Sequence, residues 1–163
     1  MTSRIGSIPV RFAVLASYAL WIGGFTFYAA VVIPSGHAVL GDHTSVGFIT
    51  QRVTQWLNVI AVIALAIFSI EAYLARRAGF HRRGVVVLVA ALAVFQLGLV
   101  VLHPHLDQLL DTQEQAVIDR RHFYQWHRIY LLTASAQWFA AVGYLWYLLR
   151  AWRGEDAGGG ARS

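Results

Sequence analysis

The sequence predicts an all-α protein, an integral membrane four-helix bundle, and three observations support this prediction. The chain of 163 residues is 58% hydrophobic and 13% charged, whereas soluble domains carry about 25% charged residues. It contains four long apolar runs, each able to cross a hydrocarbon core of about 30 Å as a helix. Its histidines and arginines are distributed unequally between the two sides of the predicted membrane. We therefore expect a single four-span domain over residues 1–153.

The predicted spans follow the apolar runs. They cover about residues 12–33, 56–75, 85–102 and 129–149. Backbone groups in lipid must be satisfied within a helix or a closed barrel, and the runs lack the strict alternation of barrel strands. The second run has a polar helical lead-in from about Val46. Breakers are expected to end the first and third helices, at Pro34-Ser35-Gly36 and at His103-Pro104-His105.

The arginines predict the orientation of the bundle. Most of them accompany the N-terminus, the turn between the second and third runs, or the C-terminus: Arg4, Arg11, Arg76, Arg77, Arg82, Arg83, Arg150, Arg153 and Arg162. A smaller group lies on the opposite face: Arg52, Arg120, Arg121 and Arg128. The positive-inside rule then places both termini in the cytoplasm. We expect a multi-pass protein of the bacterial inner membrane, with its first run acting as an uncleaved signal anchor.

Two further segments carry structural predictions. Between the third and fourth runs, apolar and amide side chains keep helical spacing: Leu106, Leu109, Leu110, Gln113 and Val117. This pattern predicts an amphipathic helix on the outer membrane surface, or an extension of the third helix, and leaves open whether residues 104–122 form a lid. The glycine-rich tail, residues 154–163, is expected to be disordered.

Glu71 is the only acid within a predicted span. An ionisable side chain at the end of a span usually finds a partner or extends toward the interface. We expect Glu71 to form a snorkelling ion pair with Arg76 and Arg77, with a proton site as the alternative.

The composition restricts the cofactor chemistry. The chain has no cysteine and Met1 is its only methionine, so thiolate and thioether ligands are excluded. The net charge of +5 is explained by membrane topology, and a nucleic-acid partner is not expected. The expected partner is the lipid bilayer, together with either a membrane protein partner or a second copy of the chain.

Histidines gather on the predicted periplasmic face: His37, His43, His103, His105, His122 and His127. His103 ends the third run and His127 precedes the fourth, so antiparallel neighbours would hold them at similar depth. This arrangement suits a bis-histidine haem or a His-ligated metal ion, and a nearby carboxylate is a usual partner of a ligating histidine. The candidate cofactor ligands are His103 and His127, and the candidate metal set is His103, His105, Asp107, His122 and His127. The alternative is that these histidines are ordinary polar residues of the interface.

A polar stripe marks the start of the second helix. Gln51, Gln55 and Asn58 recur at i, i+4 and i+7, which places them on one helix face. Buried amides in a membrane bundle usually form hydrogen bonds between helices. Such bonds are the expected role here, with substrate contact as the alternative. Gln96 and Gln137 lie deeper in the predicted bundle.

Two segments carry a family resemblance. The stretch from Trp21 to Tyr28, leading to Pro34, resembles the first helix of the domain-of-unknown-function 4149 family, also called transmembrane-protein-205-like. The stretch Phe123-Tyr124-Gln125-Trp126-His127-Arg128 resembles the start of the fourth helix of that family. The resemblance implies a four-helix membrane bundle and no established activity. A fainter likeness, through Trp126, His127 and Arg128, is to anthrone-oxygenase-like small membrane proteins.

Three functions follow as alternatives. The first is metal or haem binding through the histidines of the periplasmic face. The second is a structural or accessory subunit of a membrane complex without a cofactor. The third is a small oxygenase-like membrane enzyme, with His127 and Arg128 at an outer-leaflet pocket. A transporter is disfavoured because the sequence shows neither an intramembrane acid–base chain nor an inverted repeat.

Overall fold

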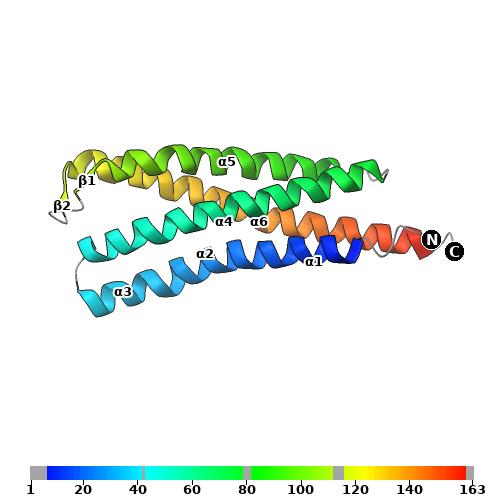
Figure 1. Cartoon of the computed structure of the whole chain (residues 1–163), viewed down its shortest axis with the longest axis horizontal. Helices are drawn as coiled ribbons and strands as arrows, with labels where there is room; N and C mark the ends of the chain where they lie inside the picture. Colours follow the sequence, from blue (N-terminus) through cyan, green and yellow to red (C-terminus); the bar gives the residue numbers. More distant parts are fainter. Residues whose placement is uncertain (1–6, 42, 79–81, 112–115, 161–163) are drawn as a thin grey trace.

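Four long helical rods run alongside one another in the computed structural model, which describes residues 7–41, 43–78, 82–111 and 116–160 (Figure 1). The last three rods are α4 (His43–Arg77), α5 (Arg83–Asp107) and α6 (Arg120–Gly160). The first rod is a succession of short helices: α1 (Ser7–Tyr18), η1 (Ala19–Gly23), α2 (Gly24–Phe27), η2 (Tyr28–Val32) and α3 (Ile33–Leu40). The prediction of an all-α, four-helix protein is thus confirmed.

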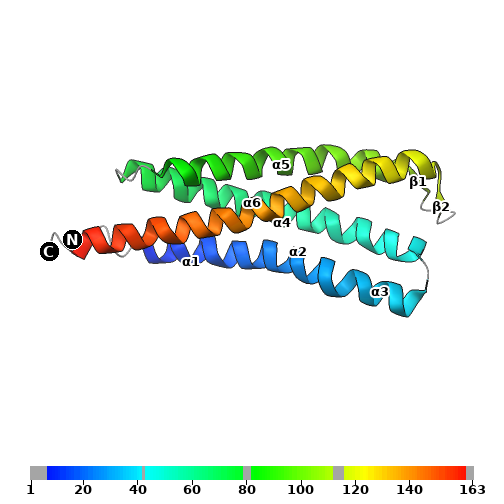
Figure 2. The ribbon, with the colours of Figure 1, turned by 180° about the vertical axis from the view of Figure 1, so that it is seen from behind.

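The two ends of the bundle differ, as Figures 1 and 2 show. Both chain termini lie at one end, together with the turn between α4 and α5, and we call this the termini end. The other end holds the α3–α4 connection and a short antiparallel pair of strands, β1 (Leu110–Asp111) and β2 (Ala116–Val117). We call it the hairpin end.

Within the described part of the chain, three helices are long and apolar enough to span a membrane. They are Ile8–Leu40, Ser45–Arg77 and Arg83–Asp107, so the chain is a multi-pass membrane protein by helix length and hydropathy. Helix α6 is not among them. Its apolar run includes Gln137 and several tyrosines and tryptophans, which lower its mean hydropathy, although it packs along α5.

The first rod continues further than its breakers predict. Pro34 does not end the helix: Val32 and Ile33 before it are both in the right-handed helical conformation, and Pro34 directly follows the π-helical turn η2. Proline is tolerated inside a membrane helix where a local π-helical adjustment accommodates the missing N–H. The helix ends instead at Gly41, whose φ of 64° is the left-handed conformation common after helices.

The segment that joins α5 to α6 is not the predicted amphipathic helix. The prediction that His103-Pro104-His105 ends the third helix is wrong, because α5 continues through Pro104 to Asp107. Such an extension was one of the two alternatives for this segment, and the chain then forms the antiparallel β1–β2 pair. Asp119 fixes the start of α6, because its Oδ1 accepts a hydrogen bond from the backbone N–H of His122 at 3.1 Å, the geometry of an N-cap. Gln113 lies outside the described residues.

The prediction of a disordered tail from Gly154 is also wrong for the residues that the structure describes. Helix α6 continues to Gly160. Glu155 and Asp156 form ion pairs with arginines of other elements, and these contacts hold the additional turns against the bundle.

An aromatic core fills the half of the bundle nearer the termini. The fully buried ring of Phe68 on α4 stacks on that of Tyr144 on α6, with centroids 4.6 Å apart. Trp21 and Tyr18 of the first rod lie 6.2 and 6.5 Å from the same Phe68 ring. Leu92 of α5 is buried in the same cluster. All four rods therefore meet at this layer, and packing there fixes the positions of the rods relative to one another.

Candidate functional site

His103 and Asp107 form a polar pair at the hairpin end. Because α5 continues past Pro104, the two residues share one helix face, and His103 Nδ1 lies 3.3 Å from Asp107 Oδ1. Gln51 Nε2 of α4 donates to the same oxygen at 2.8 Å. The imidazole is 13% exposed, and its Nε2 is buried without a hydrogen-bond partner. The expected pairing of His103 with Asp107 is therefore present.

A chain of amides continues from this level into the bundle. Asn58 Nδ2 donates to the Tyr130 hydroxyl at 3.4 Å, and Gln96 Nε2 donates to Asn58 Oδ1 at 2.9 Å. Gln137 Nε2 donates in turn to Gln96 Oε1 at 3.0 Å. These bonds join α4, α5 and α6. The interhelical hydrogen bonds expected of the polar stripe are present for Gln51 and Asn58, whereas Gln55 is exposed.

The substitution Gln96→Leu is expected to lower the free energy of unfolding by about 1–2 kcal/mol. The change leaves Asn58 Oδ1 without its donor and Gln137 Nε2 without its nearest acceptor. An unsatisfied buried polar group costs about 1–3 kcal/mol, and interhelical hydrogen bonds in membranes average about 0.6 kcal/mol. Unfolding in detergent measures the effect. Gln55→Leu is the control, and equal destabilisation by both variants would contradict the expectation.

A groove opens between α4 and α5 beside the His103–Asp107 pair. Its volume is about 430 Å³. It is lined by Gln55, Asn58, Val59, Val62, Ile63, Val100, His103, Pro104 and Asp107. The polar side chains lie toward the hairpin end, and the side chains deeper in the bundle are aliphatic. The groove thus changes from polar to apolar along the bundle axis.

The other histidines of the hairpin end have separate neighbours. The His105 ring stacks on Trp126 with centroids 5.9 Å apart, and the His127 ring stacks on Phe123 at 5.6 Å. Within the described ranges, no group of three or more His, Asp or Glu side chains is placed to hold a metal ion. Of the candidate metal set, the structure brings His103 and Asp107 into contact. A haem or metal ion bound through His103 and His127 stays a prediction.

The pKa values of two side chains near the start of α6 are shifted from their ordinary values. The hydrogen bonds from the ring and the backbone N–H of His122 lower the pKa of Asp119, with the ring nitrogen 2.6 Å from Asp119 Oδ2. Burial lowers the pKa of His127 because it disfavours the charged imidazolium. His127 is therefore neutral at neutral pH, whereas Asp119 is ionised.

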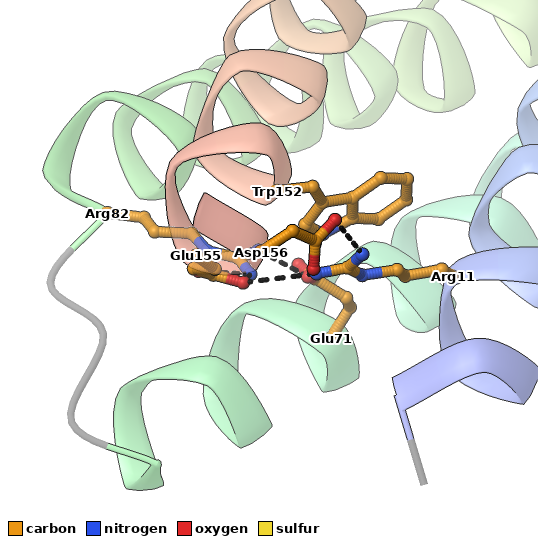
Figure 3. A network of polar contacts seen from close by, with 6 residues as sticks. All are labelled: Arg11, Glu71, Arg82, Trp152, Glu155 and Asp156. Carbon is orange, nitrogen blue, oxygen red and sulfur yellow. Dashed lines mark hydrogen bonds and ion pairs between the residues drawn. The ribbon is translucent and has the colours of Figure 1, made fainter. Parts of the chain in front are cut away.

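A buried ion cluster closes the termini end (Figure 3). Arg82, which directly precedes α5, donates from Nε and Nη2 to the two carboxylate oxygens of Glu155, each at 2.6 Å. Arg82 Nη1 also pairs with Glu71 Oε1, which accepts a second bond from Trp152 Nε1 at 3.0 Å. The side chains of Glu71 and Arg82 are 5% and 8% exposed, so this pair is buried within the end of the bundle.

The partner of Glu71 is therefore Arg82, and the predicted pair with Arg76 and Arg77 is wrong. These two arginines follow Glu71 at i+5 and i+6, and neither spacing brings side chains together on a helix. Both are exposed, and the Arg77 guanidinium lies 5.0 Å from the centre of the Tyr73 ring.

Arg11 extends the ion cluster to the first rod. Its Nη1 lies 2.9 Å from Asp156 Oδ2, its Nη2 lies 3.5 Å from Glu155 Oε2, and its guanidinium sits 5.1 Å from the centre of the Trp152 ring. Residues from α1, α4, the α4–α5 turn and α6 thus meet in one network (Figure 3). No sequence pattern described above predicted this network. The available signal was the acidic pair Glu155-Asp156, placed among arginines directly after the fourth apolar run.

Comparison of the chain with protein-family models, with curated proteins and with solved structures gives no match.

Proposed function

We propose that the protein is a four-span membrane protein that takes a small amphipathic molecule from the bilayer into the groove between α4 and α5. In this proposal both termini are cytoplasmic and the groove opens in the outer leaflet. The observation that carries the proposal is the change of the groove from polar to aliphatic along the bundle axis.

The proposed fourth crossing is supported by the path of α6. This helix starts beside the hairpin end and returns along α5 to the termini end (Figure 2). If the other three rods cross the bilayer, α6 must share the same slab for most of its length. The arginine distribution then supports cytoplasmic termini through the positive-inside rule.

The groove is suited to an amphipathic occupant. Val62, Ile63 and Val100 supply its deeper wall, where an alkyl or ring group replaces lipid chains without exposing polar atoms. His103 and Asp107 border its other end, where a polar head finds hydrogen-bonding partners near the membrane surface. Ligand sites commonly combine mostly apolar walls of about 300–1,000 Å³ with a few convergent polar groups.

Filling the groove is expected to weaken ligand binding at least about tenfold. The probe is radiolabelled 1-dodecanol, a neutral amphiphile, measured by saturable binding to the protein in phosphatidylcholine nanodiscs. Val100→Trp places an indole in the groove wall, and the loss of one buried hydrocarbon contact of 1–3 kcal/mol corresponds to roughly a tenfold weaker affinity. Val94→Trp is the matched control, because Val94 is exposed on another face of α5.

Saturable binding that Val100→Trp weakens and Val94→Trp preserves supports the proposed function. Absence of saturable binding to the unsubstituted protein, or an equal effect of both tryptophans, would contradict it.

A further inference from the structure

We propose that the occupant of the groove is a long-chain primary amine, whose ammonium group binds the free oxygen of Asp107. This inference rests on the proposed function and adds the chemical class of the ligand. Three features of the groove carry it: an unused carboxylate oxygen, the absence of a lining arginine, and a second acceptor one helical turn along α4.

One oxygen of the Asp107 carboxylate is hydrogen-bonded within the protein, and the other is not. Oδ1 accepts from Gln51 Nε2 at 2.8 Å and lies 3.3 Å from His103 Nδ1. Oδ2 has no hydrogen bond from the described residues. The side chain lines the groove and is 40% exposed, so Oδ2 is held in place through its partner oxygen and stays accessible. A carboxylate oxygen only accepts hydrogen bonds, so the head that it binds must be a donor.

The charge of the groove favours a cationic donor. Asp107 is the one acid among the lining residues, and no arginine is among them. Asp107 therefore supplies the formal negative charge of the groove, and its two neighbours Gln51 and His103 both contact Oδ1, not Oδ2. Beside aliphatic walls such a charge interacts more strongly than in bulk water, which favours an ammonium head and repels carboxylate and phosphate heads.

The amide of Gln55 supplies the second acceptor. Gln55 follows Gln51, the partner of Asp107, by four residues, so both side chains point from the same face of α4. Gln55 also lines the groove, and its amide is exposed. An ammonium carries three donors in a compact group. It can therefore donate to Asp107 Oδ2 and to the Gln55 carbonyl oxygen while its alkyl chain follows Val59, Val62 and Val100.

Binding of three probes of equal chain length tests the inference: dodecylamine, 1-dodecanol and dodecanoate. Each is measured with the protein in phosphatidylcholine nanodiscs, after subtraction of binding to nanodiscs without protein. We expect dodecylamine to bind about tenfold more tightly than dodecanol, since a hydrogen bond to a charged group contributes about 1.5–3 kcal/mol. Dodecanoate is expected to bind more weakly than either.

The variant Asp107→Asn separates charge from shape. It is expected to lower the affinity for dodecylamine to the level of dodecanol, because the amide keeps the shape of the carboxylate and removes its charge, and saturable dodecanol binding by the same variant shows that the groove is still present. Equal affinities of dodecylamine and dodecanol for the unsubstituted protein would overturn the inference and leave the proposed function standing. Loss of preference in the Val94→Trp control would overturn it as well. Failure of all three probes to bind saturably contradicts the proposed function itself.

Discussion

Arg82→Leu is expected to lower the free energy of unfolding by about 3–5 kcal/mol, the cost of breaking a buried ion pair by removing one partner. The guanidinium binds both oxygens of Glu155 and one oxygen of Glu71. Without it, two carboxylates that are 13% and 5% exposed lose their main counterion. The remaining donors, Arg11 and Trp152, each contact only one of them.

Arg83→Leu is the matched control for this prediction. Arg83 is the next residue along the chain and carries the same charge, but its side chain is exposed. Its loss is expected to change the free energy of unfolding by less than about 0.5 kcal/mol. Unfolding in mild detergent, followed by tryptophan fluorescence, measures both variants. Similar midpoints for Arg82→Leu and the unsubstituted protein would show that the ion cluster contributes little to stability.

Phe68→Ala is expected to cost about 3–5 kcal/mol, the range for removing a buried aromatic ring. The ring has no exposed surface and stacks on Tyr144 at 4.6 Å. Trp21 and Tyr18 also lie against it. A cavity at this layer removes packing between three of the four rods at once. Packing is the main attraction between helices in lipid, where burial of apolar surface gives little advantage.

Phe27→Ala is the corresponding control. It deletes the same ring from a position that is 61% exposed, so no internal cavity forms. We expect a change of less than about 1 kcal/mol, measured by the same detergent unfolding. If Phe27→Ala destabilises the protein as much as Phe68→Ala does, the buried aromatic layer contributes no more to stability than an exposed ring does.

The sequence predicted the helices better than their ends. The apolar runs are long and continuous, and their length is set by the bilayer, so local composition was sufficient to locate the four rods. Pro34 and Gly154 were misread because a breaker acts through its context. Pro34 directly follows a π-helical turn, and the helical path continues through it. Gly154 is followed by Glu155, whose ion pair with Arg82 keeps the helix in place.

The candidate site likewise has parts that follow from local sequence and parts that depend on how distant segments pack. The contact between His103 and Asp107 was predictable because residues four positions apart on one helix are neighbours. Arg82 and Glu155 are 73 residues apart, and no periodic pattern connects them. The groove was equally hidden, since it depends on how α4 and α5 pack and on which side chains between them are small.

The bidentate contact between Arg82 and Glu155 gives the chain an order of assembly during synthesis. Glu155 is made after all four apolar runs, and so are Trp152 and Asp156. Until they emerge, Arg82 has Glu71 as its one carboxylate partner, and Arg11 has none from this cluster. The complete ion cluster can therefore form only after the end of α6 has been made, and it then joins the last helix of the chain to α1, α4 and the α4–α5 turn.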